Sequence, residues 1–79
     1  MNKVFEIGKI YSALTNSGNL AGFGVTILTR TEKMAIVKES GNEQAVYIEK
    51  GAENEYFDVR DYANRKKRCV ADLLWKQSN

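Results

Sequence analysis

Histidine is missing from this sequence of 79 residues, and with it the side chain that proteins use most often as a general base and as a metal ligand. The single cysteine, Cys69, can form no disulfide within the chain, and zinc sites built from cysteine and histidine are excluded as well. Proline is also absent, so every residue can donate a backbone hydrogen bond to a sheet. These absences argue against an enzyme and against a bound metal or cofactor, and they suit a protein made of strands.

Long apolar runs are absent too. No stretch approaches the ~20 residues that a membrane helix needs, and the N-terminus lacks the apolar segment of a signal peptide. The chain is short enough for one hydrophobic core only, and its 43% hydrophobic content argues against disorder. We therefore expect a single soluble domain over residues 1–79, in a reducing cytoplasm and without membrane contact.

The first two thirds of the chain alternate apolar and polar residues with a period of two, which is typical of half-buried strands. Turn-forming residues separate these segments at 15–19, 30–33, 40–43 and 51–54. The pattern predicts five strands, at 4–14, 23–30, 34–38, 45–48 and 56–59. Five short strands with a turn at each junction predict a curled antiparallel sheet or a small barrel of the SH3 or OB kind.

From Asp61 onward the spacing changes. Between residues 62 and 74, side chains that could share one face of a helix recur at intervals of three and four. The alanines and leucines in this segment also have high helix propensity. Asp61 suits the N-cap position of such a helix. We therefore predict an α+β fold with a C-terminal helix. The alternative is an all-β fold with a last strand at 68–75, whose core-facing residues would be Cys69, Ala71, Leu73 and Trp75.

A run of four cations stands out because the net charge of the whole chain is only +2. These cations and others that the fold can bring near them are candidate contacts for the phosphates of nucleic acid or for a nucleoprotein complex. The candidates are Arg65, Lys66, Lys67 and Arg68 of the run, with Arg60, Lys76, Arg30 and Lys33. Geometry limits the run in either conformation: a helix spreads four consecutive residues around its axis, and a strand points two to each side.

Acidic residues precede the basic run, and they suggest a second hypothesis. Glu49, Glu53, Glu55 and Asp58 are candidates for an acidic face that contacts a basic groove on a protein partner. The protein would then be an inhibitor of a host enzyme or defence complex, of the anti-CRISPR type. A third hypothesis is a homodimer in which Leu73, Leu74 and Trp75 are buried between subunits.

Two further residue types bear on chemistry. Lys67 and Arg68 would favour a thiolate at Cys69, but without a histidine the better interpretation is a small buried residue. Most aromatic residues of so small a domain belong to its core, whereas Tyr11, Tyr47 and Tyr56 stay candidates for stacking on bases, since a tyrosine can bury its ring and keep its hydroxyl wet.

Short motifs over roughly residues 5–60 carry a resemblance. The segment GKIYS at 8–12 precedes a strand that ends in RTEK at 30–33, and EY at 55–56 and Tyr62 follow a hairpin. In this order the chain resembles small β-proteins of unknown activity that bacteriophages and mobile elements encode. The resemblance implies a phage accessory protein in the bacterial cytoplasm, with no active site to carry over. The chain departs from the family's pattern at its end, where the basic run and the residues LLW stand.

Overall fold

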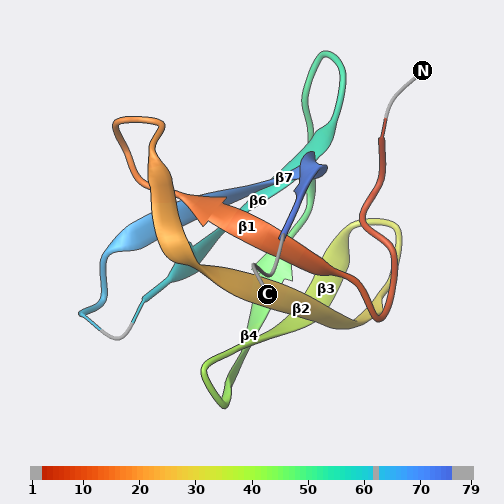
Figure 1. The fold of residues 1–79 in the computed structure, drawn as a ribbon. Helices are drawn as coiled ribbons and strands as arrows, with labels where there is room; N and C mark the ends of the chain where they lie inside the picture. The colour runs from red at the N-terminus through yellow and green to blue at the C-terminus, as the bar shows by residue number, and fades with distance from the viewer. Residues whose placement is uncertain (1–2, 62, 76–79) are drawn as a thin grey trace.

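The computed structural model describes residues 3–61 and 63–75, and this part of the chain is entirely β (Figure 1). Within these residues, seven strands form one antiparallel sheet with the order β4-β3-β2-β1-β7-β6-β5. Their bounds are β1 Ile10–Leu14, β2 Leu20–Arg30, β3 Met34–Glu39, β4 Asn42–Tyr47, β5 Glu49–Lys50, β6 Glu55–Arg60 and β7 Lys66–Leu74. Within residues 3–61 and 63–75 there is no helix that could cross a membrane.

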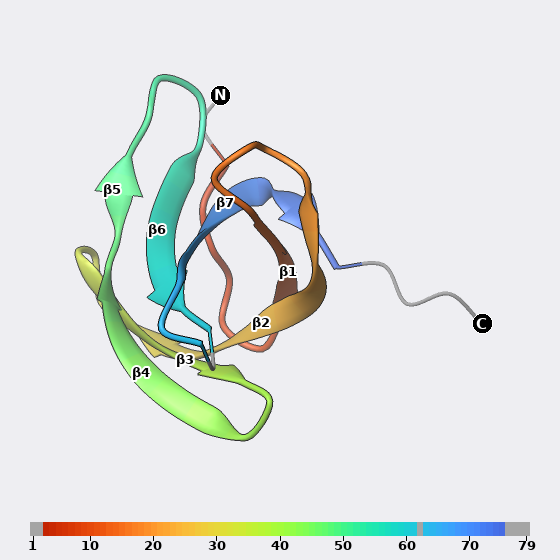
Figure 2. The same ribbon diagram turned by 90° about the vertical axis from the view of Figure 1, so that its left-hand side faces the viewer.

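The sheet curls into a nearly closed barrel because its two edges are made by one continuous segment. β4 and β5 stand at opposite ends of the strand order, yet only Ile48 separates them in the chain. Figure 2 shows this segment running along one side of the barrel, past β3 first and then β6. Between β4 and β6 the Gln44 side chain replaces a backbone pair, since its amide donates to the Arg60 carbonyl (2.8 Å) and accepts from the Arg60 N–H (3.1 Å).

Alternation along the strands fills the barrel with apolar side chains. Every second residue of β3 and β6 points inward and is buried, and in the middle of β2 Val25 and Ile27 follow the same alternation. The segment before β1 supplies Phe5, whose ring lies 4.7 Å from that of Tyr11 and 4.5 Å from that of Phe57. The buried apolar set is Phe5, Tyr11, Ala13, Val25, Ile27, Ala35, Val37, Val46, Ile48, Phe57, Val59, Cys69 and Ala71.

The turn between β3 and β4 shows how local chemistry fixes strand register. Its two central residues, Ser40 and Gly41, both have positive φ (50° and 83°), as a two-residue turn between twisted strands requires. The β3–β4 pairing then runs without a bulge from Glu39↔Asn42 to Met34↔Tyr47. The predicted connection at 40–43 is therefore a tight hairpin with only two residues outside the strands.

The predicted C-terminal helix is wrong, and with it the α+β fold class. Residues 66–74 form β7, which pairs with β6 on one side and β1 on the other, so the all-β alternative describes the fold. Asp61 does cap backbone amides, but those of a hairpin turn: its Oδ1 accepts from the N–H groups of Ala63 (2.9 Å) and Arg65 (2.8 Å). Asn64 has φ of 61°, which turns the chain back instead of continuing a helix. Pairing with two strands thus overrides the helical preference of the sequence.

The strand count also needs correction. In the part of the chain that the structure describes, the predicted five strands become seven, because β5 and β7 are added and the others keep their order. The first predicted strand, at 4–14, is shorter in the structure and begins at Ile10. Residues before it lie against other parts of the barrel, as Lys3 does in a parallel bridge to Asn54. Tyr62, which contributed to the helix pattern and to the family resemblance, lies outside the described residues.

Candidate nucleic-acid interface

β7 divides the four consecutive cations between different surroundings. Lys66 and Arg68 point to the outside of the barrel, with side chains 52% and 49% exposed. Lys67 points the other way, and its Nζ lies 3.1 Å from Asp61 Oδ2 with little exposure of either side chain. Arg65 lies exposed in the β6–β7 turn. Alternation along β7 therefore exposes Lys66 and Arg68 and covers Lys67, as expected for a strand. With Arg65 in the turn, three of the four cations lie on the surface.

Register with β6 assembles an outer surface that we call the basic face, defined by Arg60, Arg65, Lys66 and Arg68. Arg60 pairs with Lys66 and Asp58 with Arg68 across the β6–β7 ladder, so these side chains are near neighbours on one side of the sheet. Arg60 also donates to the Asn64 carbonyl (3.3 Å), which holds it over the turn. The basic face carries more positive charge than the chain as a whole.

Asp58 lies in the middle of this surface and orders it. Its carboxylate accepts two hydrogen bonds from Arg68, at Nε (3.0 Å) and Nη2 (3.3 Å), and lies 4.0 Å from Lys66 Nζ. The Asp58 hydrogen bond raises the pKa of Arg68 above its ordinary value, so the guanidinium stays charged. Arg68 Cζ also lies 4.4 Å from the centre of the Tyr56 ring, a cation–π contact.

Two shallow depressions flank Arg68. The first lies between the β1–β2 loop and the basic face, and is lined by Leu14, Thr15, Asn16, Gly18, Asp58, Lys66 and Arg68. The second lies beside the β5–β6 loop, and is lined by Gly51, Ala52, Glu53, Asn54, Tyr56, Arg68 and Val70. Each measures about 330–340 Å³ and is open to solvent, so neither encloses a substrate as a catalytic pocket does. An extended ligand that lies across the surface suits them better.

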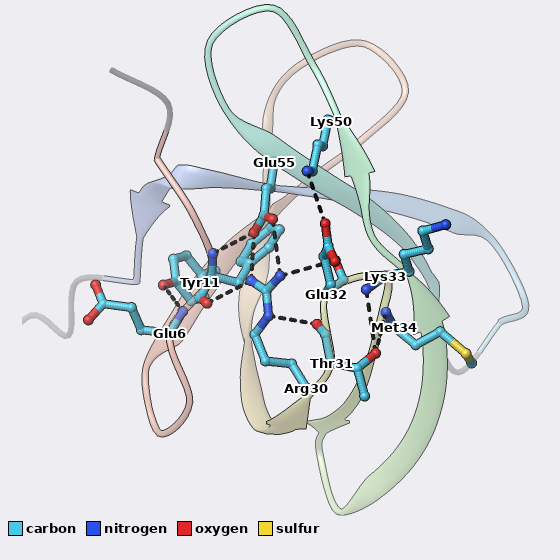
Figure 3. A network of polar contacts seen from close by, with 10 residues as sticks. Glu6, Tyr11, Arg30, Thr31, Glu32, Lys33, Met34, Lys50 and Glu55 are labelled. Atoms are coloured by element: carbon cyan, nitrogen blue, oxygen red, sulfur yellow. Dashed lines mark hydrogen bonds and ion pairs between the residues drawn. The ribbon is translucent and has the colours of Figure 1, made fainter.

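Arg30 is a candidate that the structure places elsewhere (Figure 3). Its guanidinium makes a two-point contact with Glu55 (2.6 and 3.1 Å) and donates to the carbonyls of Phe5, Thr31 and Glu32. These five bonds use all five N–H donors of an arginine, so none remains for a phosphate. Lys33 is exposed on the β2–β3 turn, on the opposite side of the barrel from the β6–β7 turn (Figure 1). Lys76 lies outside the described residues.

The acidic candidates do not gather on one surface. Glu55 is buried against Arg30, Asp58 lies among the cations of the basic face, Glu49 is exposed on β5, and Glu53 lines the second depression. Burial alone would raise the pKa of Glu55, but hydrogen bonds from Arg30 and from the Phe5 N–H outweigh it and hold the pKa below its ordinary value. Glu55 is thus a charged structural residue that ties the N-terminal segment to β2 and β6.

The three candidate tyrosines differ in exposure, and so do the C-terminal apolar residues. Tyr11 is buried and its hydroxyl accepts from the Glu6 N–H (2.9 Å), whereas Tyr47 is 70% exposed on β4 and Tyr56 is half-buried beside Arg68. Of the expected dimer seam, Leu74 is exposed, and Leu73 and Trp75 are half-buried within the subunit.

Cys69 is buried in the barrel, where desolvation raises its pKa to about 12. We expect the folded protein to react with a disulfide reagent at pH 8 roughly a thousandfold more slowly than the urea-unfolded chain, because the thiolate is scarce and covered. Absorbance of the released thiol measures both rates. Equal rates would show that Cys69 is an accessible nucleophile. Among residues 3–61 and 63–75 no cluster of acidic and cysteine side chains could hold a metal ion.

The depression beside the β1–β2 loop is the part of this site that sequence reasoning missed. Thr15, Asn16 and Gly18 were identified only as turn formers, and their approach to Lys66 and Arg68 depends on β7 pairing with β1.

Comparisons with known proteins found no matching family model, no matching curated protein and no matching solved structure.

Proposed function

We propose that the protein is a non-enzymatic binding module that contacts nucleic acid, alone or in a nucleoprotein complex, through the basic face. The observation that carries this proposal is the placement of Arg60, Lys66 and Arg68 together on the outer side of the β6–β7 hairpin, with Arg65 in its turn. Cations grouped on one surface can contact phosphates, and the affinity they give is independent of sequence and falls with salt.

The character of the surroundings supports a binding surface. The depressions beside Arg68 are open, and the only thiol is buried with its pKa raised. As part of the same proposal, the resemblance to phage accessory proteins suggests that this module acts in the cytoplasm of a bacterial host.

Charge reversal on the basic face tests the proposal. In an anisotropy titration with a labelled oligonucleotide at low salt, we expect the native protein to bind and Lys66→Glu with Arg68→Glu to abolish binding. With three phosphate contacts on a single strand, the logarithm of the affinity should fall against the logarithm of salt with a slope of about −2.

A matched control separates a local surface from net charge. Lys33→Glu with Lys38→Glu changes the total charge by the same amount at exposed positions outside the basic face. We expect this variant to keep most of its affinity. No binding by the native protein, or equal losses in both double variants, would contradict the proposed function.

The exposed apolar residues of β2, β3 and β4 favour a second candidate function, a protein-binding inhibitor of a host enzyme or defence complex. Leu28 and Met34 are each 37% exposed and Tyr47 is 70% exposed, and Met34 and Tyr47 are paired across strands. Apolar side chains grouped on a surface suit a protein partner better than phosphates. Retention of a stoichiometric host protein after nuclease treatment, lost on Tyr47→Ala but not on Lys66→Glu with Arg68→Glu, would support this candidate over the first.

A further inference from the structure

Arg68 and Arg30 differ in how many of their N–H donors already have a partner among the described residues. The described residues take only two of the five N–H donors of Arg68, both through Asp58, whereas all five donors of Arg30 have partners. The two-point contact with Asp58 fixes the plane of the Arg68 guanidinium. The side chain is still 49% exposed, so this ordered, planar cation faces solvent.

The Tyr56 ring packs against the Arg68 guanidinium. The guanidinium carbon lies 4.4 Å from the centre of the ring, and the backbone of Gly51 packs against the same ring. A Cβ at Gly51 would lie 3.4 Å from Tyr56 Cδ1, an ordinary van der Waals distance, so the β5–β6 loop lies next to the ring. The ring and the guanidinium therefore form a fixed stack, which we call the Tyr56–Arg68 platform.

A stacked guanidinium offers a flat surface on which a nucleobase can lie. In a duplex the faces of each base are covered by its neighbours, so only an unpaired base can use such a surface. The two depressions lie on either side of Arg68, along the direction that an extended strand would take from the β1–β2 loop to the β5–β6 loop. Lys66 borders the first depression, where it can contact a phosphate next to the stacked base.

We propose that the ligand of the basic face is single-stranded nucleic acid, with one unpaired base stacked on the Tyr56–Arg68 platform. This inference rests on the proposed function and adds the ligand's strandedness to it. Arg68 serves as both a phosphate-attracting charge and a stacking surface, whereas Lys66 contributes charge alone. The two residues should therefore respond differently to the presence of bases.

The test compares three labelled probes with the native protein at one low salt concentration. They are an oligothymidylate of about 12 nucleotides, a length within the ~4–16 that a small OB barrel covers, an abasic strand with the same number of phosphates, and a duplex. We expect oligothymidylate to bind about five- to a hundredfold more tightly than the abasic strand, because one stacked base contributes that much. Equal affinities for these two strands would overturn the inference.

Three variants test whether the platform carries the effect. Arg68→Lys keeps the charge but removes the planar group, so we expect oligothymidylate affinity to fall to within about threefold of that of the abasic strand, while abasic affinity stays within about twofold. Lys66→Ala should weaken all three probes by a similar factor. Tyr56→Phe keeps the ring and should bind like the native protein. An unchanged preference for bases in Arg68→Lys would place stacking elsewhere and overturn the inference.

The outcomes keep the two proposals apart. Failure of every probe to bind at low salt contradicts the proposed function itself. Binding of all three probes with equal affinity leaves the proposed function in place and removes only the preference for a single strand. Because Arg68 and Tyr56 are partly exposed, Arg68→Lys and Tyr56→Phe should both fold, and a urea-unfolding curve verifies this before titration.

Discussion

Glu55→Ala should unfold most of the protein at room temperature. The substitution leaves the Arg30 guanidinium without a carboxylate in a site where its side chain is only 16% exposed, and removes the acceptor of the Phe5 N–H. Breaking such a pair costs about 3–5 kcal/mol, which is comparable with the ~3–5 kcal/mol that the single core of a domain this small supplies. The midpoint of urea unfolding, followed by circular dichroism, measures the loss. A change of less than about 1 kcal/mol would contradict this role.

A milder variant keeps the prediction testable if Glu55→Ala does not fold. Glu55→Gln retains an oxygen acceptor and loses the charge, so its free energy of unfolding should lie between those of the native protein and Glu55→Ala. In a second control, Arg30→Met with Glu55→Leu replaces both charges by apolar groups and should recover part of the stability, because no buried charge is left unpaired.

The same pair governs the response to acid. Since the pKa of Glu55 is lowered by folding, the carboxylate's contribution is complete above its unfolded value of about 4.3 and is lost as pH falls through the folded value. The native protein should therefore lose stability below about pH 4, more steeply than Glu55→Gln. Asp61, whose pKa is lowered chiefly by the Arg65 backbone N–H, acts in the same direction in both proteins, so their difference isolates Glu55.

Gly24→Ala should displace the ring of Trp75. A Cβ at position 24 would lie 2.6 Å from Ile10 Cγ2 and 3.0 Å from Trp75 Cγ, and a branched side chain so close to the backbone cannot simply rotate away. We expect a loss of about 1–3 kcal/mol in the free energy of unfolding, typical of overpacking, with a red-shifted tryptophan emission. Trp75 is the only tryptophan, so emission reports its surroundings alone.

Controls separate crowding from the loss of a glycine. Gly18→Ala adds the same methyl group where nothing lies within 4 Å, so it should cost only backbone strain at φ of +86° and leave the emission unchanged. Ile10→Ala in the Gly24→Ala protein removes the nearest atom and should restore part of the emission of the native protein. An unshifted emission spectrum in Gly24→Ala would show that Trp75 does not rest on Gly24.

The sequence pattern predicted a strand correctly where neighbouring residues alone determine it. Met34 to Val37 is a short apolar run bounded by turn-forming residues, and Ser40-Gly41 can adopt the positive φ that closes a hairpin, so strand and turn follow from neighbouring residues. The strand at 66–74 did not follow, because its residues also suit a helix and only pairing with β1 and β6 decides between the two. β5 is two residues long, too short for any periodic pattern.

The candidate site, too, has features that neighbouring residues predict and features that depend on strand pairing. That a strand would split the basic run was predictable from alternation, and Lys67 does point away from Lys66 and Arg68. The partners of each cation were not, since they depend on register: Asp58 meets Arg68 only because the turn at Asp61 sets the β6–β7 ladder. Arg30 and Glu55 are 25 residues apart, and no local signal joins them.

The continuous segment from β4 to β5 has a consequence for how the molecule comes apart. An open sheet can lose its edge strand while the rest stays paired, and it can also recruit a strand from another chain. Here the outermost strands are one piece of polypeptide that pairs with β3 and with β6, so detaching either end disturbs both. Amide hydrogens throughout the barrel would then exchange through a single concerted opening.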